Sequence, residues 1–523
     1  MPSWTERLPG RSRLGSGLRA AQDVGPLLRF RASGLRGRAR RSATGAFALI
    51  GLLTVAAGWA PAYLPGADGS ESPFPVESTD LLLLLPSTFL GVLVIAIISA
   101  MASGGGRELL PRDQGVAYPV SPTTDHLGAL LMAPLNIAWL LQSWLLLGVT
   151  AFVVGPERLY AAQLPALLWL VTATALAQAV AWGAEWVRRG AHGLWLLRGL
   201  TGLAVVTMAV LVVTERLTTV LDSIPTLQIV LGVLHGAEGH WLLWLRAVGV
   251  LVVLLVGAVV AGAYLAGAAA RRPARDELRV ETSAHRPRPN PASDLLAMVR
   301  VDRAGVWRSV PLRRGMAVLA LLPGLVALAG GLEWSMLNLL PGLVASGGAL
   351  LFGVNAWCLD GRGALWRASL PVSAHQVFWA RVVVLVEVLL LSAALTLVLG
   401  VLRAGRPTTS EVVALVCCTL VVSLQVVSAA LRWSVRRPFA VDLRSARATP
   451  APPLVMVGYS SRLALSTTLT AMVFIVTSSV DQWRWSVLLA IPFLLFSAYR
   501  LVRVSESWSR PEVRARVAVT VAS

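Results

Sequence analysis

Long apolar runs, separated by short polar or charged segments, recur along the whole chain. A helix that crosses roughly 30 Å of hydrocarbon needs about 20 mostly apolar residues. Twelve runs come close to that length, six in each half of the chain. The pattern predicts an all-α integral membrane protein with about twelve transmembrane helices in two pseudo-repeated six-helix halves. The predicted spans are 46–64, 81–102, 127–154, 161–187, 194–214, 241–270, 315–331, 340–358, 376–402, 411–432, 461–480 and 485–503.

The arginines are distributed unevenly between the segments that join these spans. If the N-terminus is cytoplasmic, the inside segments hold 38 of the 46 basic residues and the outside loops hold five. Positive charge accumulates in cytoplasmic loops, so we expect an even number of spans with both termini in the cytoplasm. The expected division is a cytoplasmic N-terminus (1–45), a first membrane half (46–270), a cytoplasmic linker (271–314), a second membrane half (315–503) and a cytoplasmic tail (504–523).

Composition excludes several classes of protein. Hydrophobic residues make up 56% of the chain and charged residues only 14%, whereas soluble domains carry roughly 25% charge. A single soluble globule and a disordered chain are therefore excluded. The net charge of +19 lies beside the apolar runs, which favours anionic lipid headgroups over nucleic acid as its partner. Three cysteines inside apolar runs are typical of packing residues, with no spacing for a disulfide framework or a metal cluster.

Every basic residue in the chain is arginine, and there is no lysine. A Walker-type phosphate-binding loop requires a lysine that reaches the β- and γ-phosphates. If ATP drives this protein, we therefore expect another chain to hydrolyse it, and we expect no cofactor in this one.

The two halves share a motif at the same position. Pro119-Val120-Ser121 and Pro371-Val372-Ser373 lie 252 residues apart, and each stands between the second and third predicted spans of its half. We interpret each as the end of a short cytoplasmic element, followed by a serine that caps the next helix. Charged residues of these elements are expected to face the cytosol or a partner. The alternative is an ordinary polar loop.

An arginine-rich, partly apolar segment precedes the first span of each half. The segments run from Leu27 to Arg41 and from Asp294 to Arg314. Both are typical of helices that lie in the headgroup layer. The proline-rich stretch between Arg271 and Ser293 is interpreted as the linker between the halves.

This layout resembles the membrane subunit of ABC-2-type exporters. The resemblance is strongest from Asp360 to Arg381 and looser from Glu108 to Gly128. It implies that segments 103–126 and 359–375, here called the two inter-span segments, dock on a separate nucleotide-binding ATPase that holds ATP and Mg²⁺. It implies a multi-pass protein of the bacterial inner membrane. Residues expected in the docking segments are Glu108, Arg112, Asp113, Pro119, Ser121, Asp360, Arg362, Arg367, Pro371 and Ser373.

The chain departs from that family in two ways. The family usually has one six-span unit per chain, whereas two are fused here. The outside loop between the fifth and sixth spans is long in the first half (215–240) and almost absent in the second (481–484). Re-entrant external helices, which family members often carry there, are therefore expected at most in the first half.

Few polar residues lie inside the predicted spans. Glu387 is about ten residues into its span, where a carboxylate costs roughly 2.5–3.5 kcal/mol on insertion scales. It is expected either to face a translocation path or to pair with Arg381 or another helix's arginine. Asn136 and Gln142 are expected either to bond between helices or to line that path.

No catalytic residue or metal site is predicted. His235, Glu238 and His240 cluster in an outside loop, but their order and two glycines do not give the HExxH geometry of zinc proteases. A flexible loop and a metal site both stay open there. Two further functions also stay open: an ion-coupled secondary transporter, which needs several midplane carboxylates, and a polytopic membrane enzyme such as a lipid-linked glycosyltransferase.

Overall fold

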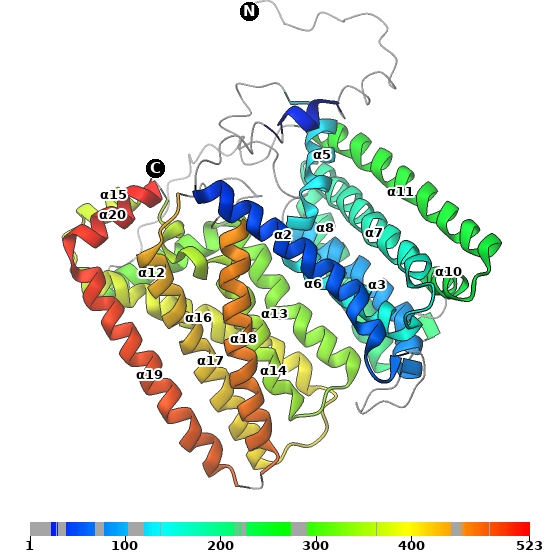
Figure 1. Ribbon diagram of the computed structural model, residues 1–523. Coiled ribbons are helices and arrows are strands. Elements are labelled where there is room, and N and C mark those ends of the chain that lie inside the picture. Colours follow the sequence, from blue (N-terminus) through cyan, green and yellow to red (C-terminus); the bar gives the residue numbers. More distant parts are fainter. Residues whose placement is uncertain are drawn as a thin grey trace, which may run out of the picture. The chain divides into compact units, whose positions relative to one another are not determined.

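Helices are the only regular elements in the part of the chain that this computed structural model describes (Figure 1). The all-helical prediction is therefore confirmed for those residues. The structure describes the chain apart from residues 1–21, 28, 30–37, 68–77, 103–119, 136, 215, 217–218, 221–225, 273–288, 290, 362, 441–450, 452, 481 and 523. The chain divides into two compact units, 1–282 and 283–523, and each is described here by itself.

Unit 1 is organised around one long central helix, α7. The apolar faces of α3, α10 and α11 pack against it. Trp169 of α7 is buried in this core and donates its indole N–H to the Phe89 carbonyl at 2.8 Å. The elements of unit 1 are α2 (Arg38–Trp59), η1 (Ala60–Tyr63), α3 (Ser78–Ala102), α5 (Pro122–Leu131), η3 (Ala133–Leu135), α6 (Ile137–Val154), α7 (Leu159–Arg188), α8 (Gly193–Val213), α10 (Thr226–Glu238) and α11 (Trp241–Ala270).

Unit 2 is built around α16 and α17, which pack against each other and against most of their neighbours. Thr396 of α16 donates to the Ala320 carbonyl of α13 at 2.8 Å, and Cys418 of α17 lies 3.4 Å from the Asn338 carbonyl. The elements of unit 2 are α12 (Asp294–Arg308), α13 (Val310–Gly330), η4 (Met336–Asn338), α14 (Leu339–Leu351), η5 (Gly353–Leu359), α15 (Gly363–Ser369), α16 (Ala374–Val401), α17 (Thr409–Arg436), α18 (Pro453–Ser478), α19 (Arg484–Ser509) and α20 (Pro511–Ala522).

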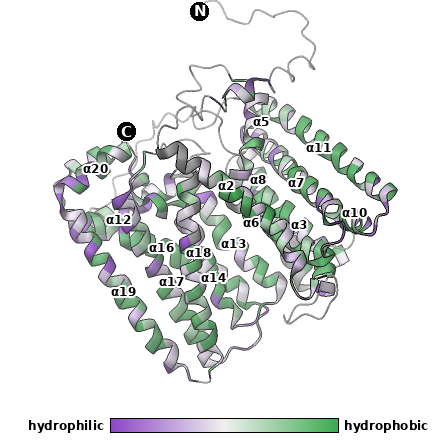
Figure 2. Ribbon diagram, viewed as in Figure 1, coloured by the Kyte–Doolittle hydropathy of each residue, from purple (hydrophilic) through white to green (hydrophobic). Residues whose placement is uncertain are grey.

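Many helices expose apolar side chains along their length, as Figure 2 shows for α11. Leu242 and Val253 of α11 are 82% and 71% exposed. Exposed apolar surface on this scale marks contact with a membrane or a partner. Among the described residues, seven helices are long and apolar enough to cross a membrane, and up to nine if each bent helix pair is one span. The chain thus has the character of a multi-pass membrane protein.

The number of spans stays a prediction. Three predicted spans, 46–64, 127–154 and 194–214, contain most of α2, α6 and α8 respectively. None of these three helices is among the up to nine candidate spans found in the described residues. The cytoplasmic location of both termini is likewise a prediction.

Two predicted spans are not single straight helices. The range 127–154 is divided into α5, η3 and α6 around Pro134, because proline removes a backbone donor and clashes with the preceding turn. The range 340–358 breaks between α14 and η5, which are bent by 49°. Asn355 there has φ −151° and ψ 74°, outside the helical region.

The second predicted headgroup-layer helix forms as α12. Ser293 caps it by accepting the Leu296 backbone N–H at 3.3 Å. Helix α12 is bent by 83° from α13, which suits a helix that lies along the surface before a span begins. The first such segment, from Leu27 to Arg41, falls largely outside the described residues.

Candidate functional site

The serine of each Pro-Val-Ser string caps the start of the helix that follows it, as predicted. Ser121 accepts the Thr124 backbone N–H at 3.0 Å at the start of α5. Ser373 accepts the Gln376 N–H at 3.2 Å at the start of α16, and the Gln376 side chain accepts the Ser373 N–H in return. The second arrangement is a complete capping box, which fixes where α16 starts. Pro371 precedes it as an exposed residue.

Several of the predicted docking and path residues lie outside the residues that the structure describes, and their roles stay predictions. They are Glu108, Arg112, Asp113, Pro119, Asn136 and Arg362.

The inter-span segment of unit 2 contains a short helix, α15, with two different faces. Leu365 and Trp366 on one face are 54% and 61% exposed. Arg367 on the other face is buried. The expectation that Arg367 faces the cytosol or a partner is therefore wrong. Its guanidinium points inward because two carboxylates lie there.

Four charged side chains meet beneath α15 and form what we call the arginine–aspartate cluster: Asp302, Asp360, Arg367 and Arg381. Asp302 of α12 accepts from Arg367 at 2.5 and 3.2 Å and from Arg381 at 3.0 and 3.1 Å. Asp360 accepts from Arg367 at 2.9 Å and from Arg381 at 2.6 Å. The two carboxylates balance the two guanidinium groups, so the cluster is neutral overall. It connects α12, the end of η5, α15 and α16.

Aromatic side chains complete the burial of Arg381, whose side chain is 0% exposed. Its guanidinium lies 4.9 Å from the ring centre of Trp357 and also donates to the Ala356 carbonyl. Trp357 stacks on Trp508 of α19, with ring centres 3.9 Å apart and planes 1° apart. The cluster is thereby linked to a fifth helix. An arginine over an indole face gains cation–π stabilisation in addition to its ion pairs.

The electrostatics of the cluster keep Asp302 ionised. Burial alone raises the pKa of its carboxyl, but the charges and hydrogen bonds of Arg381 and Arg367 outweigh burial and hold that pKa below its usual value. A buried charge is tolerated only when paired and hydrogen-bonded. Loss of any one member leaves an uncompensated buried charge, which costs about 3–5 kcal/mol.

A pocket of about 140 Å³ adjoins the cluster on the side of α20. Helices α15 and α20 lie side by side near the C-terminus (Figure 1), and the pocket is lined by Asp360, Arg367, Trp508 and Arg514 among others. Asp360 and Arg367, two members of the arginine–aspartate cluster, therefore also line this pocket.

Glu387 has a cationic partner, as one of the two interpretations predicted, and that partner is another helix's arginine rather than Arg381. Arg303 of α12 donates to it at 2.8 Å. The pair is accessible, since the side chains are 52% and 32% exposed. Gln142 of α6 is half-buried in unit 1. Glu387 belongs to unit 2 and Gln142 to unit 1, and a shared translocation path stays a prediction.

Asp302 is the site residue that sequence reasoning missed, although a signal for it was present. The buried residues of α12 are Met298, Val299, Asp302 and Val306, which repeat at helical spacing on one face. An acidic residue in register with an apolar face is expected to have a buried cationic partner. Arg381 lies inside a predicted apolar span, so it likewise indicated a buried charge that needs an oppositely charged partner.

Among the described residues, one group of three metal-ligating side chains lies close together: His235, Glu238 and His240 in unit 1. No family model, no curated protein and no solved structure matches the chain.

Proposed function

We propose that this chain is the membrane-spanning permease subunit of an ABC-type exporter, with two six-span halves fused in one polypeptide. The multi-pass helical architecture supports a role in transport. The absence of lysine excludes a Walker-type loop in this chain, so a separate nucleotide-binding subunit supplies the energy. That subunit holds ATP and Mg²⁺, and the bilayer is that of a bacterial inner membrane.

One observation carries the proposal: the arginine–aspartate cluster fastens α15 to helices that lead into the membrane. Arg367 of α15 and Arg381 of α16 share both carboxylates, Asp302 and Asp360. A force applied to α15 is therefore passed to α16 and α12 through paired charges rather than absorbed by a loose loop. This is the mechanical property that a docking element of a transporter requires.

The outer face of α15 supplies a contact surface for the ATPase subunit. Leu365 and Trp366 are both exposed on it, and tryptophan is enriched among residues that dominate binding energy at interfaces. When the ATPase subunits close, they push this face, and the arginine–aspartate cluster transmits the movement to α16. Alternating access of the membrane half follows, with transport directed outward.

The proposal is tested by capturing the full chain from its native membrane and identifying co-purified proteins by mass spectrometry. We expect a polypeptide with a Walker motif to co-purify with the wild-type chain and to be lost with Trp366→Glu. Trp485→Glu is the matched control, since Trp485 is 51% exposed on α19, next to the predicted outside loop. Capture that is equal for both variants contradicts docking at α15.

A second measurement separates the proposal from its rivals. Purified chain in proteoliposomes, without nucleotide, should not accumulate solutes under an ion gradient. Gradient-driven uptake by the chain alone would instead identify an ion-coupled secondary transporter. The pairing of Glu387 with Arg303 weighs against that alternative, because the charge of the carboxylate is already balanced by a guanidinium group. Chemical conversion of a lipid-linked substrate by the chain alone would identify a polytopic membrane enzyme.

A further inference from the structure

The turn between α10 and α11 in unit 1 brings three potential metal ligands together. Helix α10 ends at Glu238, Gly239 follows with φ +81°, and His240 is the residue just before α11. The His240 N–H donates to the His235 carbonyl at 2.9 Å. This is the 6→1 hydrogen bond of a Schellman helix end, in which the residue two positions past the helix bonds back over the last turn. Glycine is required at Gly239 because residues with a Cβ rarely adopt that backbone conformation.

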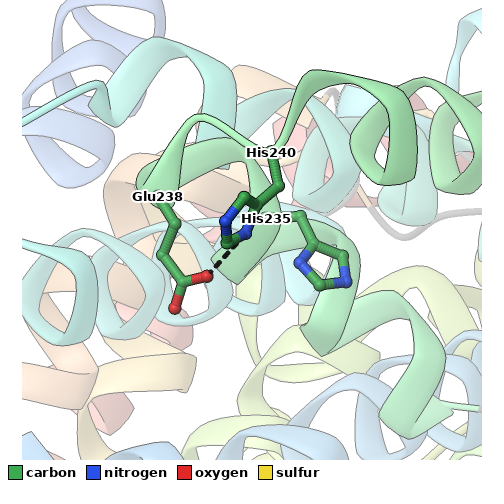
Figure 3. Close-up of side chains that lie close together, drawn as sticks. All are labelled: His235, Glu238 and His240. Carbon is green, nitrogen blue, oxygen red and sulfur yellow. Dashed lines mark ion pairs between the residues drawn. The ribbon is translucent and has the colours of Figure 1, made fainter.

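The side chains at this helix end are unusual for the motif. A Schellman end is commonly accompanied by an apolar contact between the two residues joined by that bond. Here both positions are histidine, and their ring centres lie 5.8 Å apart. Glu238 lies beside them, with its carboxylate 3.0 Å from Nδ1 of His240 (Figure 3). Two imidazoles and a carboxylate thus occupy the place of an apolar contact.

The geometry points to a transition-metal site. We propose that His235, Glu238 and His240 bind Zn²⁺ or another metal ion that prefers imidazole ligands. One ligand atom from each residue lies within 4.8 Å of the others. Metal–ligand bonds of about 2.0–2.2 Å place the ligand atoms of a tetrahedral zinc site roughly 3.3 Å apart. Small side-chain rotations therefore complete the site.

Burial supports a ligand at this site. Nδ1 of His235 is buried and has no hydrogen-bond partner among the described residues, a condition that costs free energy. A bound cation in the cluster gives that ring a partner. His240 and Glu238 have side chains that are 59% and 56% exposed, so an ion reaches the site from solution.

The ligand set selects the kind of metal. Two imidazole nitrogens favour Zn²⁺, Cu²⁺, Ni²⁺ or Co²⁺ over Mg²⁺ and Ca²⁺, which prefer oxygen ligands. Arg158 lies against this turn, because its Nη1 is 3.5 Å from the Ala237 carbonyl. Its positive charge opposes a bound cation, so we expect moderate affinity. The metal joins the end of α10 to the start of α11 and stabilises this helical hairpin.

The test uses the full chain without a histidine tag, purified in detergent and stripped with a chelator. Titration with Zn²⁺ in a calorimeter should show one ion per chain, and Co²⁺ should give the visible absorption of a tetrahedral site. His235→Ala, His240→Ala and Glu238→Gln should each weaken Zn²⁺ binding at least tenfold. His192→Ala, at an exposed position elsewhere in unit 1, is the matched control and should bind as the wild type does.

Stability provides a readout that does not depend on transport. Zn²⁺ should raise the unfolding temperature of the wild type and of His192→Ala but not of His240→Ala, and Mg²⁺ should raise none of them. The proposal is overturned if the wild type binds no Zn²⁺, or if the three ligand variants bind it as tightly as the control.

Discussion

Arg381 lies fully buried between two carboxylates, and its stabilising effect depends on both of them. An ion pair at the surface contributes roughly 0–1 kcal/mol, whereas a buried charge that loses its partner costs several kcal/mol. The chain contains both cases, since Arg503 and Glu506 form an exposed pair near the end of α19 and the arginine–aspartate cluster is buried. Asp302 and Arg303 are adjacent in α12, yet Asp302 belongs to the buried arginine–aspartate cluster and Arg303 to the accessible pair with Glu387.

We expect Arg381→Met to lower the free energy of unfolding by about 3–5 kcal/mol, because it leaves the buried carboxylates with too little positive charge. Arg503→Met, which breaks the exposed pair of Arg503 with Glu506 near the end of α19, is the matched control and should cost about 1 kcal/mol or less. Thermal unfolding of both purified variants in the same detergent measures the difference. Equal losses for the two substitutions would show that the arginine–aspartate cluster does not stabilise unit 2.

The same cluster predicts how stability changes in acid. The folded-state pKa of Asp302 lies below its ordinary value of 3.8. Its contribution is therefore complete above pH 3.8 and is lost as the pH falls through the lower folded-state pKa. Wild-type stability should drop more steeply below pH 3.8 than that of Asp302→Asn, which has no carboxyl to protonate there. Parallel pH profiles of the two proteins would contradict this assignment of charge.

At the scale of elements, the sequence predicted the helices and their serine caps, which depend on residues close together in the chain. It missed the helix breaks and the inward position of Arg367. Long apolar runs and the repeated Pro-Val-Ser string identified helices and both serine caps, because helix formation and capping depend on residues a few positions apart. The breaks at Pro134 and near Asn355 were missed, because hydropathy does not register backbone geometry. The inward position of Arg367 was also missed, since its carboxylate partner Asp302 is 65 residues away.

The capping box of α16 gives a prediction at this scale. Ser373→Ala should cost about 1 kcal/mol and speed hydrogen exchange of the first amides of α16, including that of Gln376, since that N–H loses its acceptor. Ser373→Asp keeps an acceptor and is the control. Exchange in α17, which has its own capping box at Thr408, should not change. Unaltered exchange at Gln376 in the alanine variant would mean that the capping box does not fix the helix start.

At the scale of the whole molecule, the parity of the span count decides between two topologies. Twelve spans place both termini on one side of the membrane. The seven long helices, or nine with the bent pairs, would place the termini on opposite sides. The arginine distribution favours the even count, because 38 of 46 basic residues then lie in the cytoplasm.

Reporter fusions test that parity. A fluorescent protein that matures only in the cytoplasm should fluoresce when fused before Met1, within the loop at His192 and after Ser523, and should stay dark at Gly405 in a predicted outside loop. A phosphatase that is active only outside the cytoplasm should give the reverse pattern. Strong phosphatase activity after Ser523 together with fluorescence before Met1 would establish an odd count, and α2, α6 and α8 would then be the first helices to re-examine as spans. Agreement of all four positions with the even count would instead require α8 to cross in addition to the nine candidates, because His192 and Gly405 would lie on opposite sides. It would also require α2 and α6 to cross together or not at all, because Met1 and His192 would lie on the same side.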